Sequence, residues 1–385
     1  MIKHLSTYLL VDARIISENE DLIDAAILVE RGIITRIARR SDIPVMEGVP
    51  VIDAQGRTAG PGLIDMHLHG AGGVDISEGD VLQNLIHMAD FLEARGITSF
   101  QPAMVMDMER LFSIQQALQK NDRLAHKIPG VYVEGPFLNE RRRGGIPLEN
   151  IEGFSRSRLD RILALKVRGR PIVRTMTFAP ELEGSDTIHQ LLIEAGVTPA
   201  WGHSEAYCED VMDSEPCHLT HCFNAMQGID HRKPGLALLP FLRKNSDMTF
   251  EIIADGVHIN PAMLDFICSH AAETQLCLIS DAMKSAGLGA GESLYLGQNV
   301  WCDGRVSRYR DTGVLIGSAM LISETAQELY ARGWIDTRMF FQIASTNPAR
   351  VLGMADRGIL KEGKLADIVL CEEDMRISTV LPCVI

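Results

Sequence analysis

The sequence predicts an α/β fold in which a (β/α)8 TIM barrel is flanked by a small β-sandwich. Short apolar segments recur along the chain, and amphipathic stretches such as Asp80–Arg95 and Ser185–Ala195 separate them. Residues near both chain ends follow a different pattern, because they alternate between apolar and polar side chains. A doubly wound open sheet would show the same succession of strands and helices, so the number of strands is the deciding observation.

Eight apolar segments end in glycine, proline or polar residues, as buried strands of a parallel sheet do. The stretches between them are long enough for crossover helices on the outside of a barrel. Eight units over about 250 residues fit a closed barrel. In chain order the expected strands are Leu63–His69, Thr98–Pro102, Gly130–Glu134, Val173–Phe178, Thr198–His203, His218–Cys222, Thr249–Ala254 and Gln275–Ser280.

The two chain ends are expected to build the small β-sandwich together. Residues 1–58 and 358–385 are assigned to it, and residues 59–357 to the barrel. The segment Gly358–Leu370 has the same alternating pattern as the N-terminal part. This division predicts that the chain leaves the small domain once, forms the barrel and returns.

Two hairpins are predicted from alternation and turn residues. Ala26–Gly32 followed by Ile33–Ile37 indicates two strands with Arg31 and Gly32 in the turn. Leu294–Tyr309 indicates a further hairpin outside the barrel units, with a turn at Asp303-Gly304.

Composition excludes several classes of partner. The chain has 385 residues, 46% of them hydrophobic and 23% charged, which is typical of a globular enzyme. A net charge of −14 argues against binding to nucleic acid or to an anionic membrane. No stretch reaches the roughly 20 apolar residues of a membrane span. The apolar segment within Met1–Asp12 is too short for a signal peptide. Eight cysteines without a C-x-x-C pair indicate reduced thiols, so a cytoplasmic protein is expected.

His67 and His69 are the most informative residues of the first expected strand. Side chains two positions apart on a strand point the same way, so both imidazoles can reach one ion. The strand ends in Gly70-Ala71-Gly72-Gly73, which allows a sharp turn and leaves space beside the histidines. Two histidines with ordinary polar partners in the core are the alternative.

Imidazoles and carboxylates also follow later strands, at the end where parallel barrels carry their active sites. Each residue alone could be a satisfied core group, and Asp281 could simply cap a helix. Five different strand ends with such groups point instead to one metal site. His221 is preferred over His218, because residues three apart on a strand point to opposite faces. The residues are Glu134, His203, His221, His258 and Asp281.

This set of ligands suits a divalent metal, with zinc as the first choice and iron or manganese as alternatives. Such an ion lowers the pKa of bound water from about 15.7 towards about 7 and polarises a carbonyl. An aspartate beside it can accept and return a proton. The sequence therefore predicts hydrolysis, with either one or two ions.

The motifs in their order resemble those of the amidohydrolase superfamily and, within it, the N-acetylglucosamine-6-phosphate deacetylases. The resemblance extends from about residue 50 to residue 370 and includes Gly317-Ser318 and Asn347–Arg350. The matching motifs are His67-Leu-His69, Glu134-Gly-Pro-Phe137, Gly202-His-Ser204, Thr220–Met226, Arg232-Lys-Pro-Gly235, Asp255-Gly-Val-His258 and Asp281-Ala282.

The resemblance implies a metal site and a proton carrier. Glu134, His203 and His221 would hold the main catalytic metal. His67 and His69 could hold a second ion, with Glu134 bridging the two. Asp281 would contact the metal, deprotonate the water and then protonate the leaving amine.

The resemblance also implies a substrate, an N-acetylhexosamine 6-phosphate, with N-acetylglucosamine 6-phosphate as the first choice. His258 would steady the acetyl carbonyl as it becomes an oxyanion. Asn224, Ala225 and Arg232 would grip the sugar phosphate. Family members are commonly dimers, so a homodimer is expected in which the neighbouring subunit completes the phosphate pocket.

One loop departs from the family pattern. Ile146 stands where the family usually has a histidine that approaches the substrate, and an isoleucine donates no hydrogen bond. Arg141, Arg142 and Arg143 in the same loop could contact an anionic substrate or form a solvated surface. The alternatives are therefore N-acetylgalactosamine-6-phosphate or another N-acyl substrate. A barrel without catalytic activity is a third reading, but such proteins usually lose their ligands and this chain keeps them.

Overall fold

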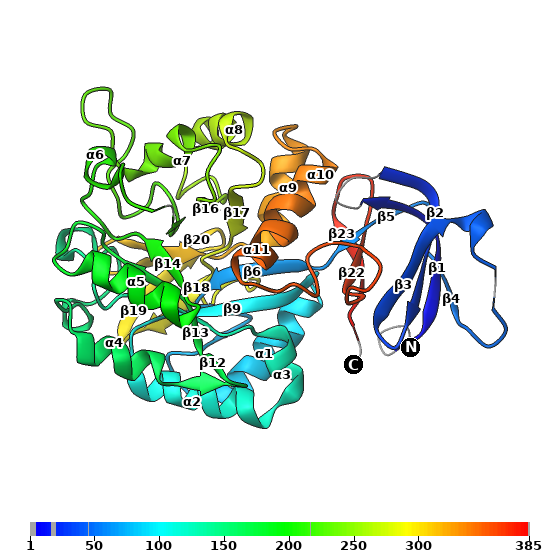
Figure 1. The fold of residues 1–385 in the computed structure, drawn as a ribbon, viewed down its shortest axis with the longest axis horizontal. Coiled ribbons are helices and arrows are strands. Elements are labelled where there is room, and N and C mark those ends of the chain that lie inside the picture. The colour runs from blue at the N-terminus through cyan, green and yellow to red at the C-terminus, as the bar shows by residue number, and fades with distance from the viewer. Residues whose placement is uncertain (1–4, 17–20, 45, 216, 384–385) are drawn as a thin grey trace. The chain divides into compact units, whose positions relative to one another are not determined.

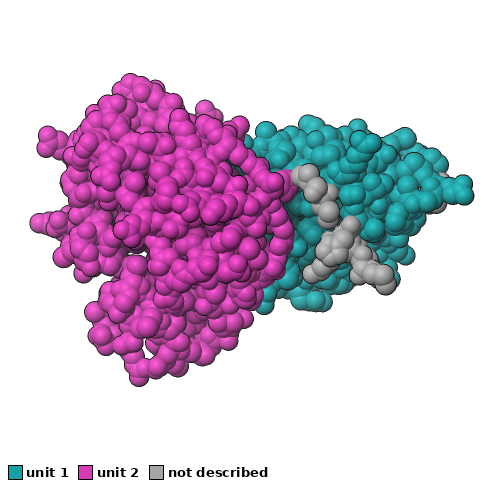
Figure 2. Space-filling model, turned by 90° about the horizontal axis from the view of Figure 1, so that it is seen from below, with its two compact units in different colours: residues 1–64, 92–99, 322–385 teal, residues 65–91, 100–321 magenta. Residues whose placement is uncertain are grey.

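The computed structural model describes residues 5–16, 21–44, 46–215 and 217–383. The chain divides into two compact units, one of residues 1–64, 92–99 and 322–385 and the other of residues 65–91 and 100–321 (Figure 2). The predicted domain boundaries at residues 58 and 358 stay predictions. No helix among the described residues is both long and apolar enough to span a membrane.

The first unit contains a seven-stranded sheet built from both chain ends, which confirms the predicted flanking β-structure. The strand order is β23-β22-β5-β1-β2-β3, and β4 pairs with β1. Leu10, Ile27 and Ile368 are among the buried apolar residues of its core. The strands are β1 Tyr8–Ile16, β2 Asp21–Glu30, β3 Ile33–Arg39, β4 Val51–Asp53, β5 Thr58–Pro61, β22 Ile368–Cys371 and β23 Ile377–Leu381.

The predicted first hairpin is confirmed by the antiparallel pairing of β2 with β3. Its turn residues Arg31 and Gly32 both have positive φ, 53° and 75°. This is the backbone conformation that a two-residue hairpin turn requires. The same unit contains the helices α9 Ile322–Ala331, α10 Thr337–Phe341 and α11 Asn347–Val351.

Eight parallel strands form the predicted barrel sheet, in the order β6-β9-β10-β13-β14-β15-β16-β17 (Figure 1). The backbone N–H of Asp281, just after the last strand, donates to the carbonyl of His67 in the first, at 2.9 Å. Asp65 also joins these strands, because its carboxylate accepts from the Ser280 hydroxyl at 2.5 Å. The strands are β6 Leu63–Leu68, β9 Ile97–Val105, β10 Val131–Glu134, β13 Val173–Phe178, β14 Thr198–Trp201, β15 His218–Leu219, β16 Thr249–Ile253 and β17 Leu276–Ile279.

Helices lie on the outside of these strands, as Figure 1 shows for α1, α2, α5 and α8. Local sequence sets their ends. Asp107 caps α2 by accepting from two backbone N–H groups, and α5 ends at Gly196 with a φ of 70°. The helices are α1 Val81–Glu93, α2 Met108–Lys120, α3 Asp122–Lys127, α4 Arg156–Leu163, α5 Ser185–Ala195, α6 Cys208–Val211, α7 Leu239–Leu242 and α8 Pro261–His270.

The predicted hairpin at Leu294–Tyr309 is part of a four-stranded antiparallel sheet that follows the last barrel strand. Gly304, with a φ of 97°, lies in the predicted turn. Two further strand pairs, β7 Gly70–Ala71 with β8 Val74–Asp75 and β11 Lys166–Val167 with β12 Arg170–Pro171, are short. The strands of the larger sheet are β18 Ala290–Tyr295, β19 Gln298–Asp303, β20 Val306–Tyr309 and β21 Leu315–Ser318.

Candidate metal centre

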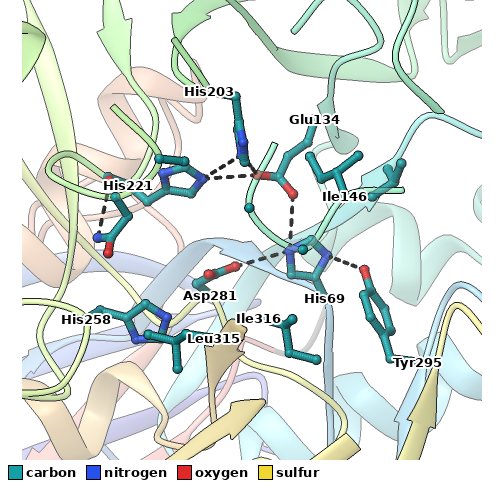
Figure 3. Close-up of a pocket in the computed structure, with 15 residues that line it drawn as sticks. His69, Glu134, Ile146, His203, His221, His258, Asp281, Tyr295, Leu315 and Ile316 are labelled. Carbon is teal, nitrogen blue, oxygen red and sulfur yellow. Dashed lines mark hydrogen bonds and ion pairs between the residues drawn. The ribbon is translucent and has the colours of Figure 1, made fainter. Parts of the chain in front are cut away.

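Glu134, His203 and His221 converge at the ends of three barrel strands. Glu134 is the last residue of β10, and the two histidines follow β14 and β15. Glu134 Oε1 lies 3.1 Å from His203 Nε2 and 3.2 Å from His221 Nε2, and the two nitrogens are 3.1 Å apart (Figure 3). Ligands about 2.0 Å from a tetrahedral ion are about 3.3 Å from one another, so this triangle fits one divalent ion.

The backbone fixes the orientation of His203. Its Nδ1 lies 2.8 Å from the carbonyl oxygen of Arg142, an acceptor only, so Nδ1 carries the proton and donates. A neutral ring of this tautomer presents the lone pair of Nε2 to Glu134 and His221. Metal-binding histidines are commonly oriented in this way.

His67 and His69 approach Glu134 together, as their spacing predicts. His69 Nε2 lies 3.4 Å from Glu134 Oε2 and 3.1 Å from Asp281 Oδ1 (Figure 3). His67 Nε2 lies 3.8 Å from Glu134 Oε1. His67, His69 and Glu134 therefore form a second group that could hold a cation, and Glu134 belongs to both groups.

The charges at the site favour a cation. His67 Nε2 is buried and hydrogen-bonds to none of the described residues. Burial alone would lower the pKa of His67, but Glu251, Glu134 and Asp281 raise it to about 10. Burial alone would raise the pKa of Glu134, yet its contacts with the imidazole rings of His203 and His221 hold this pKa well below its ordinary value. None of the described residues that line the adjoining pocket is Lys or Arg. A divalent ion fits this cluster of buried carboxylates and imidazoles.

The backbone around these side chains adopts an uncommon conformation. Five non-glycine residues beside the site have positive φ, a region that few such residues enter. They follow the ends of strands β14, β15 and β17. Such residues cluster at functional sites when the surrounding structure holds them there. They are His203 (49°), His221 (28°), Phe223 (79°), Ala225 (50°) and Asp281 (48°).

The backbone between His218 and His221 does not follow the strand alternation on which their predicted orientations were based. The two-residue strand β15 ends at Leu219, so His221 lies beyond the regular backbone. His218 is buried, and its Nε2 lies 3.0 Å from Glu251 Oε1. The expectation that only one of these two histidines faces inward was wrong, because the chain leaves the extended conformation between them.

A pocket of about 250 Å³ opens beside these potential metal ligands. It includes the predicted substrate residues Asn224, Ala225 and His258 and the catalytic candidate Asp281. One side is apolar, because Ile146 lines it in the position where the sequence departs from the family pattern. The lining residues are His69, Val105, Glu134, Gly144, Gly145, Ile146, His203, His221, Asn224, Ala225, His258, Asp281, Tyr295, Leu315 and Ile316.

The predicted arginines lie outside the lining of this pocket. Arg232 is exposed, and its backbone N–H donates to Asp230. Arg142 Nε lies 3.6 Å from Glu205, and Arg143 donates to the carbonyl of Ile146 at 2.8 Å. Their predicted contacts with substrate stay predictions. What the structure shows for Arg142 is the contact of its carbonyl oxygen with His203 Nδ1.

Sequence reasoning assigned no role to Asp255, Glu251 or Tyr295. Asp255 Oδ2 lies 2.6 Å from His258 Nδ1, and Tyr295 Oη lies 3.3 Å from His69 Nδ1. Glu251 interrupts an apolar strand, and a buried carboxylate needs polar partners. The sequence itself therefore contains a signal that Glu251 has a specific role. Tyr295 comes from the sheet outside the barrel, and the sequence offers no signal for its contact.

Comparison with known proteins identifies the family. The model of the amidohydrolase family matches residues 58–382. N-acetylglucosamine-6-phosphate deacetylase of Bos taurus is 30% identical over 84% of this chain and 82% of its own. The chain belongs to the amidohydrolase family. Within it, this similarity makes the chain a member of the N-acetylglucosamine-6-phosphate deacetylase family, as its motifs predict.

Two further relatives cover nearly the whole length of this family member. N-acetylgalactosamine-6-phosphate deacetylase of Escherichia coli O157:H7 is 29% identical over 97% of both chains. A solved structure of a mutant N-acetyl-D-glucosamine-6-phosphate deacetylase from Mycobacterium smegmatis, in complex with N-acetyl-D-glucosamine-6-phosphate, has a TM-score of 0.85. Its sequence is 28% identical, and the match covers 98% of each chain. As a member of this family, the chain is a metal-dependent hydrolase.

We expect Asp255→Asn to lower kcat about 10- to 100-fold, because an amide loses the charge-assisted hydrogen bond that orients His258. Steady-state hydrolysis and metal content check this prediction. Metal content should stay at the parent value, because neither residue belongs to the two ligand groups. A parental kcat would contradict the role given to Asp255.

Proposed function

We propose that this chain removes the acetyl group from an N-acetylhexosamine 6-phosphate, N-acetylglucosamine 6-phosphate first, and releases acetate and the amino sugar phosphate. The observation that carries the proposal is the opening of the Glu134–His203–His221 triangle into the pocket that also contains Asp281 and His258. The relatives of Bos taurus and Mycobacterium smegmatis support the same substrate class.

Each residue has a proposed task. Glu134, His203 and His221 would hold a main divalent ion, with His67 and His69 placed for a second. A bound ion would supply an acidified water and polarise the acetyl carbonyl. Asp281 would take a proton from that water and pass it to the leaving nitrogen. His258, oriented by Asp255, would face the acetyl oxygen with Nε2.

Zinc is the proposed metal, since imidazole and carboxylate ligands at these separations suit a tetrahedral site. Iron and manganese remain the alternatives. Elemental analysis of protein purified without chelator decides among them. The proposed compartment is the cytoplasm, and burial of seven of the eight cysteines supports core thiols in a reducing environment.

Acetate release from a panel of substrates tests the proposal. The panel contains N-acetylglucosamine 6-phosphate, N-acetylgalactosamine 6-phosphate, unphosphorylated N-acetylglucosamine and an N-acetyl amino acid. We expect the highest kcat/KM with a hexosamine 6-phosphate. Turnover of the amino acid alone would overturn the sugar phosphate proposal and keep the hydrolase.

N-acetylgalactosamine 6-phosphate is the second candidate. The Escherichia coli relative with that name matches 97% of this chain, whereas the Bos taurus relative matches 84%. Ile146 lines the pocket and offers no hydrogen bond to a sugar hydroxyl. The ratio of kcat/KM for the two epimers decides between the candidates.

A homodimer is proposed to complete the phosphate pocket. The described lining of the pocket contains neither Lys nor Arg to pair with the phosphate, while Arg232 is exposed. Arg232 of a second copy is therefore a candidate to meet the phosphate.

We expect Arg232→Ala to raise KM for the phosphorylated sugar about 10-fold or more with little change in kcat. Steady-state kinetics with phosphorylated and unphosphorylated sugar check this prediction. The exposed Arg36 of β3, which is absent from the pocket lining, offers a matched control, Arg36→Ala. An equal rise in KM for the unphosphorylated sugar would contradict phosphate binding by Arg232.

A further inference from the structure

Glu251 is a buried carboxylate that the proposed reaction does not use. It lies in the middle of β16 with none of its surface exposed. Burying an isolated carboxylate is very unfavourable unless hydrogen bonds and opposite charges compensate. Its partners therefore indicate what it does.

Glu251 contacts three histidine residues. Its Oε2 lies 3.1 Å from His67 Nδ1 and accepts from the backbone N–H of His221 at 2.9 Å. Its Oε1 lies 3.0 Å from His218 Nε2, and His218 Nδ1 in turn lies 2.7 Å from Thr249 Oγ1. The carboxylate thus reaches both groups of proposed metal ligands from inside the barrel.

This contact decides which nitrogen of His67 can bind a metal. An ionised carboxylate only accepts hydrogen bonds, so the proton of a neutral His67 ring sits on Nδ1. Nε2 then carries the lone pair and faces the space between Glu134 Oε1, at 3.8 Å, and Asp281 Oδ1, at 3.7 Å. Both separations are too long for hydrogen bonds and leave room for a cation.

The hydrogen-bond partner of His69 does not select one tautomer of its ring. His69 Nδ1 faces the hydroxyl of Tyr295 at 3.3 Å, and a hydroxyl both donates and accepts. Tyr295 is therefore compatible with either tautomer of His69. Between these two histidines, only the partner of His67 selects a metal-binding form.

We propose that Glu251 is a positioning residue that holds His67 with Nε2 available to a second cation shared with His69 and Glu134. The inference depends on the proposed metal centre and adds a residue outside its ligands. Glu251 thereby governs occupancy of the second position more than that of the first. Carboxylate partners of metal-binding histidines also raise the basicity of the ring.

Two substitutions of Glu251 test the inference with a binding measurement. Glu251→Gln keeps the size of the side chain but removes its charge. The amide has one acceptor oxygen, whereas the carboxylate has two. Glu251→Met removes the acceptors altogether. Zn²⁺ is titrated into chelator-treated protein by calorimetry, and bound metal is counted after dialysis. We expect the dissociation constant of the second ion to rise about 10-fold in the Glu251→Gln variant and about 100-fold in the Glu251→Met variant. The constant of the first ion should stay within about 3-fold of the parent value.

Thr249→Val is the matched control. It removes the hydrogen bond to His218 one step further from the metal ligands and leaves the carboxylate in place. We expect a lower melting temperature and unchanged constants for both ions. In the double variant His67→Asn with Glu251→Gln, the second constant should equal that of His67→Asn alone, since the carboxylate acts through His67.

Binding of both ions by a folded Glu251 variant with the parent constants would overturn the inference, as would equal weakening of both ions. The inference would also be overturned if the parent protein binds a single ion and no second one. Should the Met variant fail to fold, the Gln variant decides. Histidine ¹⁵N NMR of the zinc-loaded parent protein adds an independent check, and a neutral His67 ring with its proton on Nε2 would refute the assignment. Acetate release by the parent protein tests the deacetylase proposal separately.

Discussion

Asp281→Asn is expected to lower kcat for acetate release about a thousandfold, within the range that general acid–base groups contribute. Asp281 lies just after the last barrel strand, and its Oδ1 is 3.1 Å from His69 Nε2. An amide cannot take a proton from water at neutral pH. Asn also tolerates the φ of 48° found at this position, so the substitution isolates the loss of the carboxylate.

Steady-state kinetics and elemental analysis of the same preparation check this prediction. We expect bound metal to remain, since Glu134, His203 and His221 are intact. Asp311 is exposed, which makes Asp311→Asn a matched control expected to keep the parental kcat. Near-normal turnover by Asp281→Asn would remove Asp281 from the proton transfer.

Glu134→Gln is expected to remove bound metal and to lower hydrolysis at least about a thousandfold. Glu134 belongs to both groups of potential ligands, so its loss affects both ion positions at once. Its Oε1 faces His203 and His221, and its Oε2 faces His69 at 3.4 Å. A neutral amide binds a divalent ion far more weakly than a carboxylate does.

Metal content after dialysis and acetate release at added Zn²⁺ measure this effect. The exposed Glu183 provides a control of the same chemistry, Glu183→Gln, which should retain metal and activity. Full metal content in Glu134→Gln would show that the ion is held elsewhere. Restored activity at high Zn²⁺ would be consistent with weakened binding alone.

The barrel was predictable because its signal is local and repeated. Each buried strand needs an apolar segment, and each parallel connection needs a crossover helix, so the pattern recurs along the chain. The convergence of Glu134, His203 and Asp281 followed from the same topology, since the carboxyl ends of parallel strands meet at one rim. The spacing of His67 and His69 likewise follows from strand geometry.

Other parts of the site were beyond such reasoning. His221 approaches Glu134 and His203 through a backbone with a φ of 28°, which alternation along a strand does not describe. The partner of His67 comes from a strand 184 positions away in the chain. Arg232 has a motif position that predicts phosphate binding, yet its surroundings in a single chain leave it exposed.

Residue types and their order along the chain were sufficient to specify the barrel, the ligand types and the class of reaction. Those properties depend on short-range periodicity and on a topology that many sequences share. Folding decided which nitrogen of each histidine faces the proposed ion position, which carboxylate contacts His67 from behind, and which side chains make one wall of the pocket apolar. These depend on distances of about 3 Å between residues far apart in the chain, and such distances are set only when the strands close on one another.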